Sequence, residues 1–378
     1  MKPLEDYLIV DFSQFLSGPS ASLRLADLGA RVIKIEKPGT GDICRTLYTS
    51  DLIMNGESSV FHTINRNKES FAIDFKQPSE LEKLKKLLAK ADVVMHNFRP
   101  GVMERVGLSY DEVKKINPNI VYAEISGYGT KSELKDLPGQ DLLLQSLTAL
   151  TWLSGNQEDG PVPMGLSIVD MLAGAHLAQG ILAALYRKAT HNIGAKVQVS
   201  MLESAFDFQF ETITTYFNDG GELPLRTKSN NAHAYLGAPY GIYKTQNGYL
   251  ALAMGSIPVL ASLLKCDELL PFPENKFELR DDIKNILAEH LQTQETQYWL
   301  DILEPADIWC AKVLNYKQLF AEEGFQVLNF TQRVEMTDSY NYKTTRCPIR
   351  IDGEIFTSGK GSPKLGQDNE RIIKEFIA

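Results

Sequence analysis

The chain has 378 residues and carries 39 Lys and Arg against 48 Asp and Glu, which gives a formal net charge of −9. This length predicts two or three domains, because a single core rarely grows beyond roughly 250 to 300 residues. The acidic balance argues against broad binding to nucleic acid or to anionic membranes, since both require clustered positive charge. Any anionic ligand must therefore be bound by a local group of basic residues.

The four cysteines and six histidines show none of the spacings that are typical of a metal site or a disulfide framework. Acidic residues interrupt the N-terminal stretch MKPLEDYLIVDF, so it does not resemble a secretory signal. No run of about 18 uninterrupted apolar residues occurs. These features predict a reduced, cytoplasmic protein without a bound metal and without a membrane partner.

Short β-prone runs alternate with helical ones in the first third of the chain. The β-prone runs at 7–13, 31–37, 92–98 and 120–126 are separated by connections that are long enough for helices. Because a parallel return needs a crossover, this pattern predicts a parallel sheet with helices on its faces. The segment 79–91 is the clearest helix, with a capping box at its start and a stripe of leucines along one face.

A second long helix is predicted at about 167–186, where the segment SIVDMLAGAHLAQGILAALY is apolar on nearly all sides. Such a helix is buried, and its Gly and Ala residues allow another backbone or a ligand to approach closely. Asp170 lies near its start in an apolar context, where an unpaired charge is costly. The residues alone leave both capping and function open for Asp170, and Asp141, which precedes three leucines, fits an N-cap.

The composition changes at residue 218 to a stretch rich in Gly, Asn, Pro and Tyr. Within it, Asn247-Gly248 lies between β-prone flanks and predicts a hairpin. The predicted fold class is α/β, with a large Rossmann-like domain that contains the parallel sheet and a smaller α+β domain. The expected domains are 1–200 as the N-terminal part of the large domain, 218–325 as the small domain, and 330–378 as a C-terminal part that returns to the large domain.

Basic residues gather in the first third of the chain, several of them at predicted strand ends or just beyond. Ligands bind outside the carboxyl ends of strands in open α/β sheets, so this shared placement favours an anionic ligand, although each residue alone fits ordinary surface charge. The residues are Lys37, Arg45, Arg66, Lys68, Lys76, Arg99 and Arg105. The first turn, SQFLSGPSAS, has a single glycine and lacks the GxGxxG fingerprint of nicotinamide dehydrogenases.

Five segments together resemble the class III coenzyme A transferases, the family that includes formyl-CoA:oxalate and carnitine CoA-transferases. The segments are 25–42, 65–76, 92–129, 167–185 and 238–253. The resemblance covers nearly the whole chain and implies an enzyme that moves coenzyme A from an acyl-CoA donor to a carboxylic acid. It also implies that coenzyme A takes part as a substrate, that no other cofactor is bound, and that the protein is an interlocked homodimer.

The resemblance implies that Asp170 is the nucleophile. A carboxylate is ionised at neutral pH and attacks a thioester carbonyl without a partner base. The expected intermediates are a mixed anhydride on Asp170 and then an aspartyl-CoA thioester, and backbone N–H groups at the start of the helix are expected to stabilise the oxyanion. Asp141 corresponds to an acidic position close to the nucleophile, where it would orient the acyl group or tune Asp170.

The family pattern places the coenzyme along the first domain, where basic side chains would meet its phosphates and apolar ones its adenine and pantetheine. The implied CoA-binding residues are Gln14, Phe15, Lys37, Ile73, Lys76, Asn97, Phe98 and Arg105, and the implied acyl or acceptor pocket includes Gln140 and His233. Formyl-CoA:oxalate enzymes have His and Gln where this chain has Gln14 and Leu16, and their glycine-rich lid has no counterpart here. Oxalate is therefore not implied as the acceptor.

Two other functions stay open. An α-methylacyl-CoA racemase resembles this family in fold but needs two bases, one for each face of the α-carbon. Such racemases place a histidine immediately before the acid that corresponds to Asp141, and this chain has Gln140 there. A non-catalytic acyl-CoA-binding protein would not need Asp170. Both observations favour CoA transfer.

Overall fold

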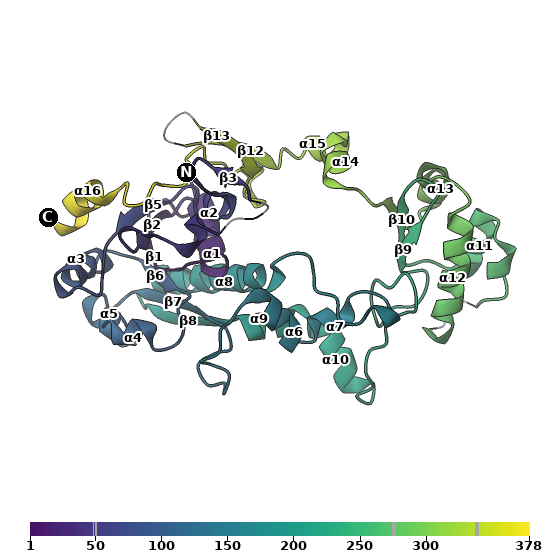
Figure 1. The fold of residues 1–378 in the computed structure, drawn as a ribbon, viewed down its shortest axis with the longest axis horizontal. Helices are drawn as coiled ribbons and strands as arrows, with labels where there is room; N and C mark the ends of the chain where they lie inside the picture. The colour runs from purple at the N-terminus through teal and green to yellow at the C-terminus, as the bar shows by residue number, and fades with distance from the viewer. Residues whose placement is uncertain (48, 50, 274–276, 337–339) are drawn as a thin grey trace. The chain divides into compact units, whose positions relative to one another are not determined.

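The computed structural model describes residues 1–378 except 48, 50, 274–276 and 337–339. The chain divides into two compact units, and Figure 1 traces its course from purple to yellow. Unit 1 comprises Met1–Leu144, Ser167–Phe208 and Leu328–Ala378. Unit 2 comprises Gln145–Leu166 and Gln209–Val327. The chain therefore leaves unit 1 twice and returns to it twice.

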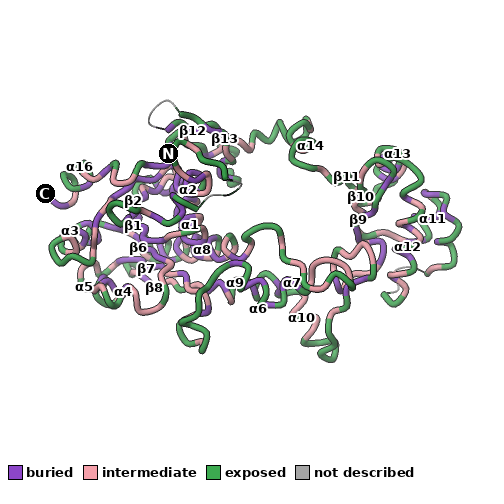
Figure 2. The backbone as a smooth tube through the Cα atoms, in the orientation of Figure 1, coloured by how far each residue is buried: buried purple, intermediate pink, exposed green. Residues whose placement is uncertain are grey.

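A six-stranded sheet forms the centre of unit 1. Its strands are β1 (Leu8–Asp11), β2 (Arg31–Glu36), β5 (Glu69–Ala72), β6 (Val93–His96), β7 (Val121–Ser126) and β8 (Ala195–Ser200). All neighbours pair in parallel, in the order β5-β2-β1-β6-β7-β8, which is the strand order of the Rossmann fold. The parallel sheet predicted from the alternating pattern is confirmed, and buried residues are concentrated along these strands (Figure 2).

The strand order reverses between β1 and β6, which are neighbours in the sheet. Ile9 of β1 pairs with Val32 on one side and with Val93 on the other. The connections that follow β1 and β6 run to opposite faces of the sheet, so a crevice opens between them at the carboxyl ends of the two strands. This topological switch point is where ligands of open α/β sheets bind.

Helices cover the sheet of unit 1. They are α1 (Ser17–Asp27), α2 (Ser59–Asn65), α3 (Pro78–Leu88), α4 (Val102–Arg105), α5 (Tyr110–Ile116), α8 (Ile168–His191), α9 (Met201–Phe208) and α16 (Asn369–Ile372), and α6 (Asp141–Leu147) begins in this unit. The leucine stripe of α3 is confirmed, since Leu84, Leu87 and Leu88 are buried in the main core. The predicted capping box is wrong: α3 begins at Pro78 after Gln77, whose side chain makes no capping bond. Proline suits the first helical position because its fixed φ matches the helix and its missing N–H has no partner there.

The helix α8 is longer than predicted, because it continues to His191. It packs against α1, α9, β7 and β8. A Cβ atom at Gly174 would lie 2.6 Å from the carbonyl oxygen of Ser17, so this glycine permits the close approach of α1. By length and composition α8 could cross a membrane, yet core helices of folded units meet the same criterion, and 44% of its most apolar stretch is buried inside the structure.

Short strands and the C-terminal residues complete unit 1. The hairpins are β3 (Ile53–Met54) with β4 (Glu57–Ser58), β12 (Thr331–Glu335) with β13 (Asn341–Thr345), and β14 (Arg350–Ile351) with β15 (Glu354–Ile355). The C-terminal residues cover the edge strand β5. Asp368 accepts the Ser70 N–H at 2.9 Å, and Asn369 accepts the Ala72 N–H at 2.8 Å. These bonds satisfy backbone groups that an open sheet edge would leave unpaired.

Unit 2 has its own sheet and core. The antiparallel sheet has the order β11-β10-β9, from β9 (Gly241–Lys244), β10 (Tyr249–Leu252) and β11 (Cys310–Lys312). The hairpin predicted around Asn247-Gly248 is confirmed, because β9 and β10 pair across this turn. The helices are α7 (Leu150–Leu153), α10 (Phe210–Asn218), α11 (Ile257–Leu264), α12 (Arg280–Leu291), α13 (Thr296–Leu303), α14 (Tyr316–Ala321) and α15 (Glu323–Gln326). Side chains from β9, β10, α11, α12 and α13 form its apolar core.

Candidate active site

The loops that follow β1 and β6 meet at the switch point of the sheet. Asn97, directly after β6, accepts the Gln14 N–H at 2.8 Å and donates to the Gln14 carbonyl at 2.6 Å. Its amide also lies 3.3 Å from the Ser17 hydroxyl at the start of α1. Asn97 therefore fastens the β1–α1 loop to the end of the neighbouring strand.

A cavity of about 670 Å³ lies at these loops, within unit 1, and its lining is mainly apolar. This volume is typical of small-molecule sites. The structure brings six of the predicted site residues to its wall: Gln14, Phe15, Asn97, Phe98, Gln140 and Asp170. The side chain of Phe98 stacks on His96, with the ring centroids 6.0 Å apart, while half-exposed Phe15 adopts a positive φ of 60°.

Asp170 is the third residue of α8 and lines this cavity. Burial, and after it the charge of the nearby Asp141 carboxylate, raises the pKa of Asp170 to about 6. A hydrogen bond from Ser17 acts in the opposite direction. The N-terminal end of a helix also favours negative charge. Asp170 is therefore a partly buried carboxylate that is still mostly ionised at neutral pH.

Asp141 fixes the start of α8. Its Oδ1 accepts the backbone N–H of Val169 at 2.8 Å and the N–H of Asp170 at 3.1 Å. Asp141 is the first residue of α6, and its place in the sequence suggests that it caps that helix. In the structure its carboxylate caps the start of α8 instead. Because the N–H groups of Val169 and Asp170 already donate to Asp141, these two are not available for an oxyanion, and the expectation that backbone N–H groups at the start of α8 stabilise one stays a prediction. Gln14 also lines the cavity, and a carboxamide N–H is a suitable donor to an oxyanion.

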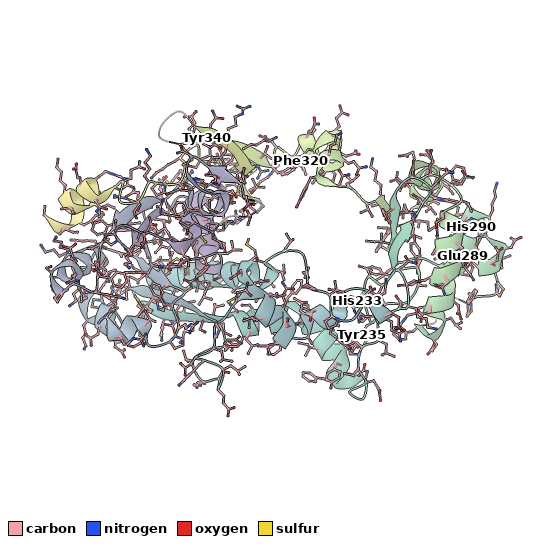
Figure 3. All side chains as sticks on the ribbon, viewed as in Figure 1. His233, Tyr235, Glu289, His290, Phe320 and Tyr340 are labelled. Atoms are coloured by element: carbon pink, nitrogen blue, oxygen red, sulfur yellow. The ribbon has the colours of Figure 1, made fainter. Side chains whose placement is uncertain are left out.

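The remaining predicted residues lie outside the cavity lining. The side chains of Lys37, Lys76 and Arg105 are exposed on unit 1. Ile73 is 1% exposed and packs in the main core. His233 belongs to unit 2, where its Nδ1 accepts the N–H of Tyr235 at 3.2 Å (Figure 3).

Three basic residues from the sequence cluster face internal carboxylates and not a ligand site. Arg45 pairs with Glu36 at 2.7 Å, Arg66 with Asp27 at 2.5 Å and Lys68 with Asp11 at 3.5 Å. All three basic side chains are buried. The prediction that these three would meet an anionic ligand is wrong, because a charge buried in the fold needs a partner within it. Arg99 does line the cavity.

The sequence reasoning missed several cavity residues, among them Ser17, Lys135 and Cys44. Ser17 bonds Asp170, Lys135 is a second basic residue of the described lining, and Cys44 faces the same space. Burial, with smaller effects from Asp42 and Asp170, raises the pKa of the Cys44 thiol to about 12. The thiol therefore stays protonated and is a poor nucleophile at neutral pH. The first turn contains four serines, Ser13, Ser17, Ser20 and Ser22, so nothing in the sequence singles out Ser17 among them.

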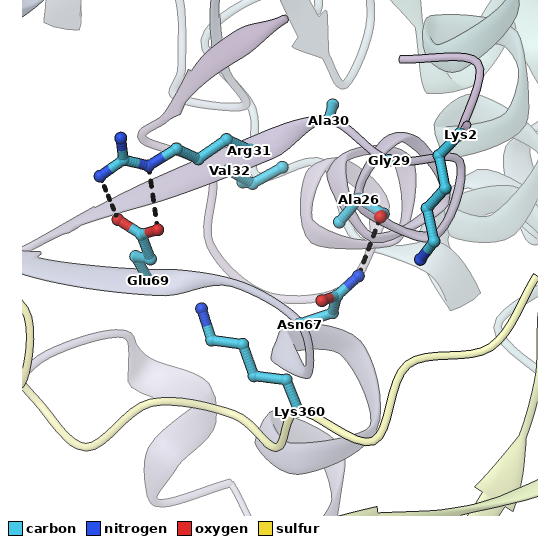
Figure 4. Close-up of a pocket in the computed structure, with 9 residues that line it drawn as sticks. All are labelled: Lys2, Ala26, Gly29, Ala30, Arg31, Val32, Asn67, Glu69 and Lys360. Atoms are coloured by element: carbon cyan, nitrogen blue, oxygen red, sulfur yellow. Dashed lines mark hydrogen bonds and ion pairs between the residues drawn. The ribbon is translucent and has the colours of Figure 1, made fainter. Parts of the chain in front are cut away.

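A second, smaller cavity of about 190 Å³ lies at the opposite edge of the sheet, where β2 and β5 begin (Figure 4). Arg31 makes two hydrogen bonds of 3.0 Å to Glu69, and the Asn67 amide donates to the Ala26 carbonyl at 2.8 Å. These polar groups of the smaller cavity bond one another and so are already engaged within the fold. The larger cavity at the switch point is therefore the candidate active site.

Known proteins resemble the chain over its whole length. It is 28% identical over 385 residues to the human succinyl-CoA:glutarate CoA-transferase, covering 100% of this chain and 86% of that protein. It is 30% identical over 388 residues to the acetyl-CoA:oxalate CoA-transferase of Acetobacter aceti, covering 100% and 96%. The crystal structure of a CAIB/BAIF family protein from Brucella suis superposes with a TM-score of 0.85 at 27% identity, covering 99% of both chains.

The model of CoA-transferase family III matches residues 4–369, which is nearly the whole chain. The family expected from the five sequence segments is thereby confirmed, and its named relatives are enzymes that transfer CoA between acids. Together with the Rossmann-type sheet and the carboxylate-bearing cavity, this match shows that the chain belongs to CoA-transferase family III.

Proposed function

We propose that this transferase moves coenzyme A from an acyl-CoA to a carboxylic acid through covalent intermediates on Asp170. The observation that carries the proposal is the position of the Asp170 carboxyl group in the switch-point cavity, with its backbone held by Asp141 and its side chain bonded by Ser17. A carboxylate in such a place is a nucleophile that needs no separate base.

The proposed reaction proceeds in two mirrored halves. An Asp170 oxygen attacks the thioester carbonyl, the C–S bond breaks, and CoA thiolate leaves behind a mixed anhydride. The thiolate then attacks the Asp170 carbonyl carbon, which releases the donor acid and forms an aspartyl-CoA thioester. The acceptor carboxylate attacks this thioester to give a second anhydride, and the thiolate attacks the acceptor carbonyl to free Asp170. No proton is gained or lost in the cycle.

The cavity wall is suited to anhydride chemistry. Apolar side chains that include Leu16, Val60 and Met201 line it, and such a lining disfavours water near a hydrolysable anhydride. The protonated Cys44 thiol does not compete with CoA for the acyl group. The Gln14 carboxamide is proposed to donate to the oxyanion.

We propose that coenzyme A binds along unit 1. Its reactive end would lie at Gln14, Phe15, Asn97 and Phe98, which line the cavity. Its phosphates would meet exposed basic side chains, for which Lys37, Lys76 and Arg105 remain the proposed contacts and Arg99 and Lys135 are added. Ile73 is proposed to support this surface from the core. His233 remains a proposed contact of the acceptor acid.

The second candidate function is α-methylacyl-CoA racemisation, which needs a base on each face of the α-carbon. Gln140 lines the cavity where such a racemase has histidine, and a carboxamide does not take a proton. The names of the relatives, which pair succinyl-CoA with glutarate and acetyl-CoA with oxalate, also favour transfer to a small carboxylic acid.

We also propose that the active form is a cytoplasmic, interlocked homodimer. The support is the apolar surface of single elements: Phe210 and Phe217 of α10 are 68% and 73% exposed. Large exposed apolar side chains gathered on one element are typical of a protein interface. Light scattering at micromolar concentration is expected to give twice the mass of 42.3 kDa, and a monomer would contradict the proposal.

The test of the proposed function is capture of the covalent intermediate. Incubation with an acyl-CoA, followed by digestion and mass spectrometry, is expected to yield CoA attached to the peptide that contains Asp170. The Asp170→Asn variant is expected to lose at least ~10³-fold in rate. The exposed Asp282 of unit 2 provides the matched control, and Asp282→Asn should react as the wild type does.

An Asp170→Asn enzyme of unchanged rate that forms no adduct would contradict the proposal. If deuterium from the solvent entered the α-carbon of the acyl group without any exchange of CoA between acids, the racemase function would be correct.

A further inference from the structure

Four charged side chains lie completely inside unit 1, directly beneath the β1–α1 loop. They are Asp11, Lys34, Asp42 and Lys68, with exposures of 0%, 0%, 1% and 0%. We refer to them as the buried charge cluster. They do not reach the cavity, and the reaction proposed above does not use them.

The lysine and aspartate nearest the loop act on its backbone. Lys34 Nζ forms an ion pair with Asp42 Oδ2 at 2.7 Å and donates a hydrogen bond to the Ser13 carbonyl at 2.7 Å. Asp42 Oδ1 accepts the N–H of Cys44 at 2.9 Å and the N–H of Phe15 at 3.4 Å. One ion pair thus holds the loop at two points.

The other pair of the buried charge cluster holds the start of the loop. Asp11 Oδ1 accepts the Ser13 N–H at 2.8 Å. Lys68 Nζ lies 3.5 Å from Asp11 Oδ2 and donates to the Asn65 carboxamide at 2.9 Å and to the Pro19 carbonyl at 3.0 Å. Each ammonium group therefore has several acceptors, as burial of a charge requires.

Together with Asn97, the buried charge cluster binds consecutive backbone groups of the loop. Asp11 and Lys34 take the N–H and carbonyl of Ser13, Asn97 takes both groups of Gln14, and Asp42 takes the N–H of Phe15. Phe15 has a left-handed backbone with φ of 60°, a conformation that a bulky residue adopts only when its surroundings impose it. The loop leads directly to Ser17, whose side chain bonds the nucleophile.

Stability alone is a weak reason for this arrangement. Buried ion pairs are often replaced by apolar residues without loss of stability, because desolvation offsets the attraction between the charges. Three bonds of the buried charge cluster end on the backbone of Ser13 and Phe15, in the loop that shapes the cavity. A role in fixing the conformation of this loop accounts both for the presence of buried charges and for the bonds that they make to the loop.

We propose that Lys34 and Asp42 are positioning residues, whose buried ion pair holds the β1–α1 loop so that Ser17 bonds Asp170 and Gln14 and Phe15 face the acyl-CoA. This inference rests on the proposed function of Asp170. Neither residue touches the substrate, so both act through the loop.

The test begins with Lys34→Met, which removes the ammonium and leaves Asp42 unpaired. A displacement of about 1 Å at a reacting centre costs up to about 10²-fold in rate, so kcat/KM for the acyl-CoA is expected to fall at least about tenfold, measured well below the melting temperature. Loss of the Ser17 bond is also expected to move the acidic limb of the rate profile to higher pH, because that bond lowers the pKa of Asp170.

Arg66→Met is the matched control. It breaks the buried Arg66–Asp27 ion pair in the same unit, at the end of α1 distant from the loop. It is expected to lower the melting temperature as Lys34→Met does, while kcat/KM and the pH profile stay within about twofold of the wild type.

The double variant Lys34→Met/Asp42→Asn separates positioning from stability and serves if the single variant does not fold. The double variant leaves no unpaired charge, so its melting temperature is expected to return to that of the wild type. The Ser13 carbonyl still lacks its donor, however, so kcat/KM is expected to stay at least about tenfold below the wild-type value. Recovery of both quantities, or an Arg66→Met loss of kcat/KM equal to that of Lys34→Met, would overturn the inference.

Asp170→Asn is measured in the same series. If Asp170→Asn keeps its rate, the proposed function fails whatever the lysine variants do. If Asp170→Asn is inactive and Lys34→Met is as fast as the wild type, only the positioning role of Lys34 and Asp42 fails.

Discussion

The Asp141 carboxylate acts on Asp170 in two ways. It accepts the backbone N–H of Asp170, which fixes the start of α8, and its charge raises the pKa of the Asp170 carboxyl group. The first effect needs an oxygen acceptor and the second needs a negative charge. Substitution by asparagine separates them, because the carboxamide keeps the acceptor and loses the charge.

We predict that Asp141→Asn moves the acidic limb of the acyl-CoA reaction to lower pH, because the pKa of Asp170 falls below about 6. Single-turnover rates between about pH 5 and 8 measure the shift. Asp141→Ala removes the acceptor as well and is expected to lower the rate at least about tenfold. An acidic limb of Asp141→Asn at or above that of the wild type would show that the two carboxylates do not interact.

The raised pKa of Asp170 also predicts a cost in stability. The pKa of the Asp170 carboxyl group is about 6 in the folded protein and 3.8 in the absence of the fold. Between these two pH values the folded state binds more protons than the unfolded state, so the free energy of unfolding falls as the pH rises from about 4 to about 6. Asp170→Asn is therefore expected to raise the free energy of unfolding by about 1 to 3 kcal/mol at neutral pH.

The gain should disappear near pH 4, where Asp170 is largely protonated in the folded wild type. Urea unfolding at the two pH values measures both differences. If Asp170→Asn is less stable than the wild type at neutral pH, the carboxylate is not strained by burial.

At the scale of elements, the contact between α1 and α8 determines the geometry of the site. Ser17 begins α1, Asp170 lies in the first turn of α8, and Gly174 allows the two helices to approach. A Cβ atom at Gly174 would meet the Ser17 carbonyl oxygen at 2.6 Å, and backbone there cannot yield without moving Ser17.

We predict that Gly174→Ala lowers kcat/KM for the acyl-CoA at least about tenfold, because it displaces Ser17 from Asp170. Gly180→Ala is the matched control on the same helix. There the nearest atom, at 2.6 Å, is a terminal methyl carbon of Val197, which can rotate away. Gly180→Ala is expected to stay within about threefold of the wild type. Equal losses in the two variants would show that the effect is general to α8.

The sequence predicts elements well where a single periodic signal dominates. The parallel strands follow from their alternation with helix-length segments, and the leucine stripe of α3 from its spacing. The start of α3 is mispredicted because Ser79 and Glu82 match a capping box while Pro78 already begins the helix. The role of Asp141 as a cap for α8 could not be predicted, since it joins segments 28 residues apart.

At the scale of the whole molecule, the net charge of −9 conceals how the basic residues are used. Arg66, Lys68 and Arg99 all belong to the group of basic residues in the first third of the sequence, and only the folded chain distinguishes their roles. Arg66 and Lys68 pair with buried aspartates, whereas Arg99 lines the cavity. The family and Asp170 could be inferred from motifs, but which cations remain for an anionic substrate depends on tertiary contacts.

The transfer of oxygen through Asp170 tests the proposed mechanism most directly. When an acceptor acid labelled with ¹⁸O resolves the aspartyl-CoA thioester, one of its oxygens stays on the Asp170 carboxyl group after CoA thiolate attacks the acceptor carbonyl. Mass spectrometry of the digested enzyme is expected to show a gain of about 2 Da on the Asp170 peptide after one turnover and about 4 Da after many, with no gain on the Asp141 peptide. Turnover that leaves Asp170 unlabelled would contradict the account.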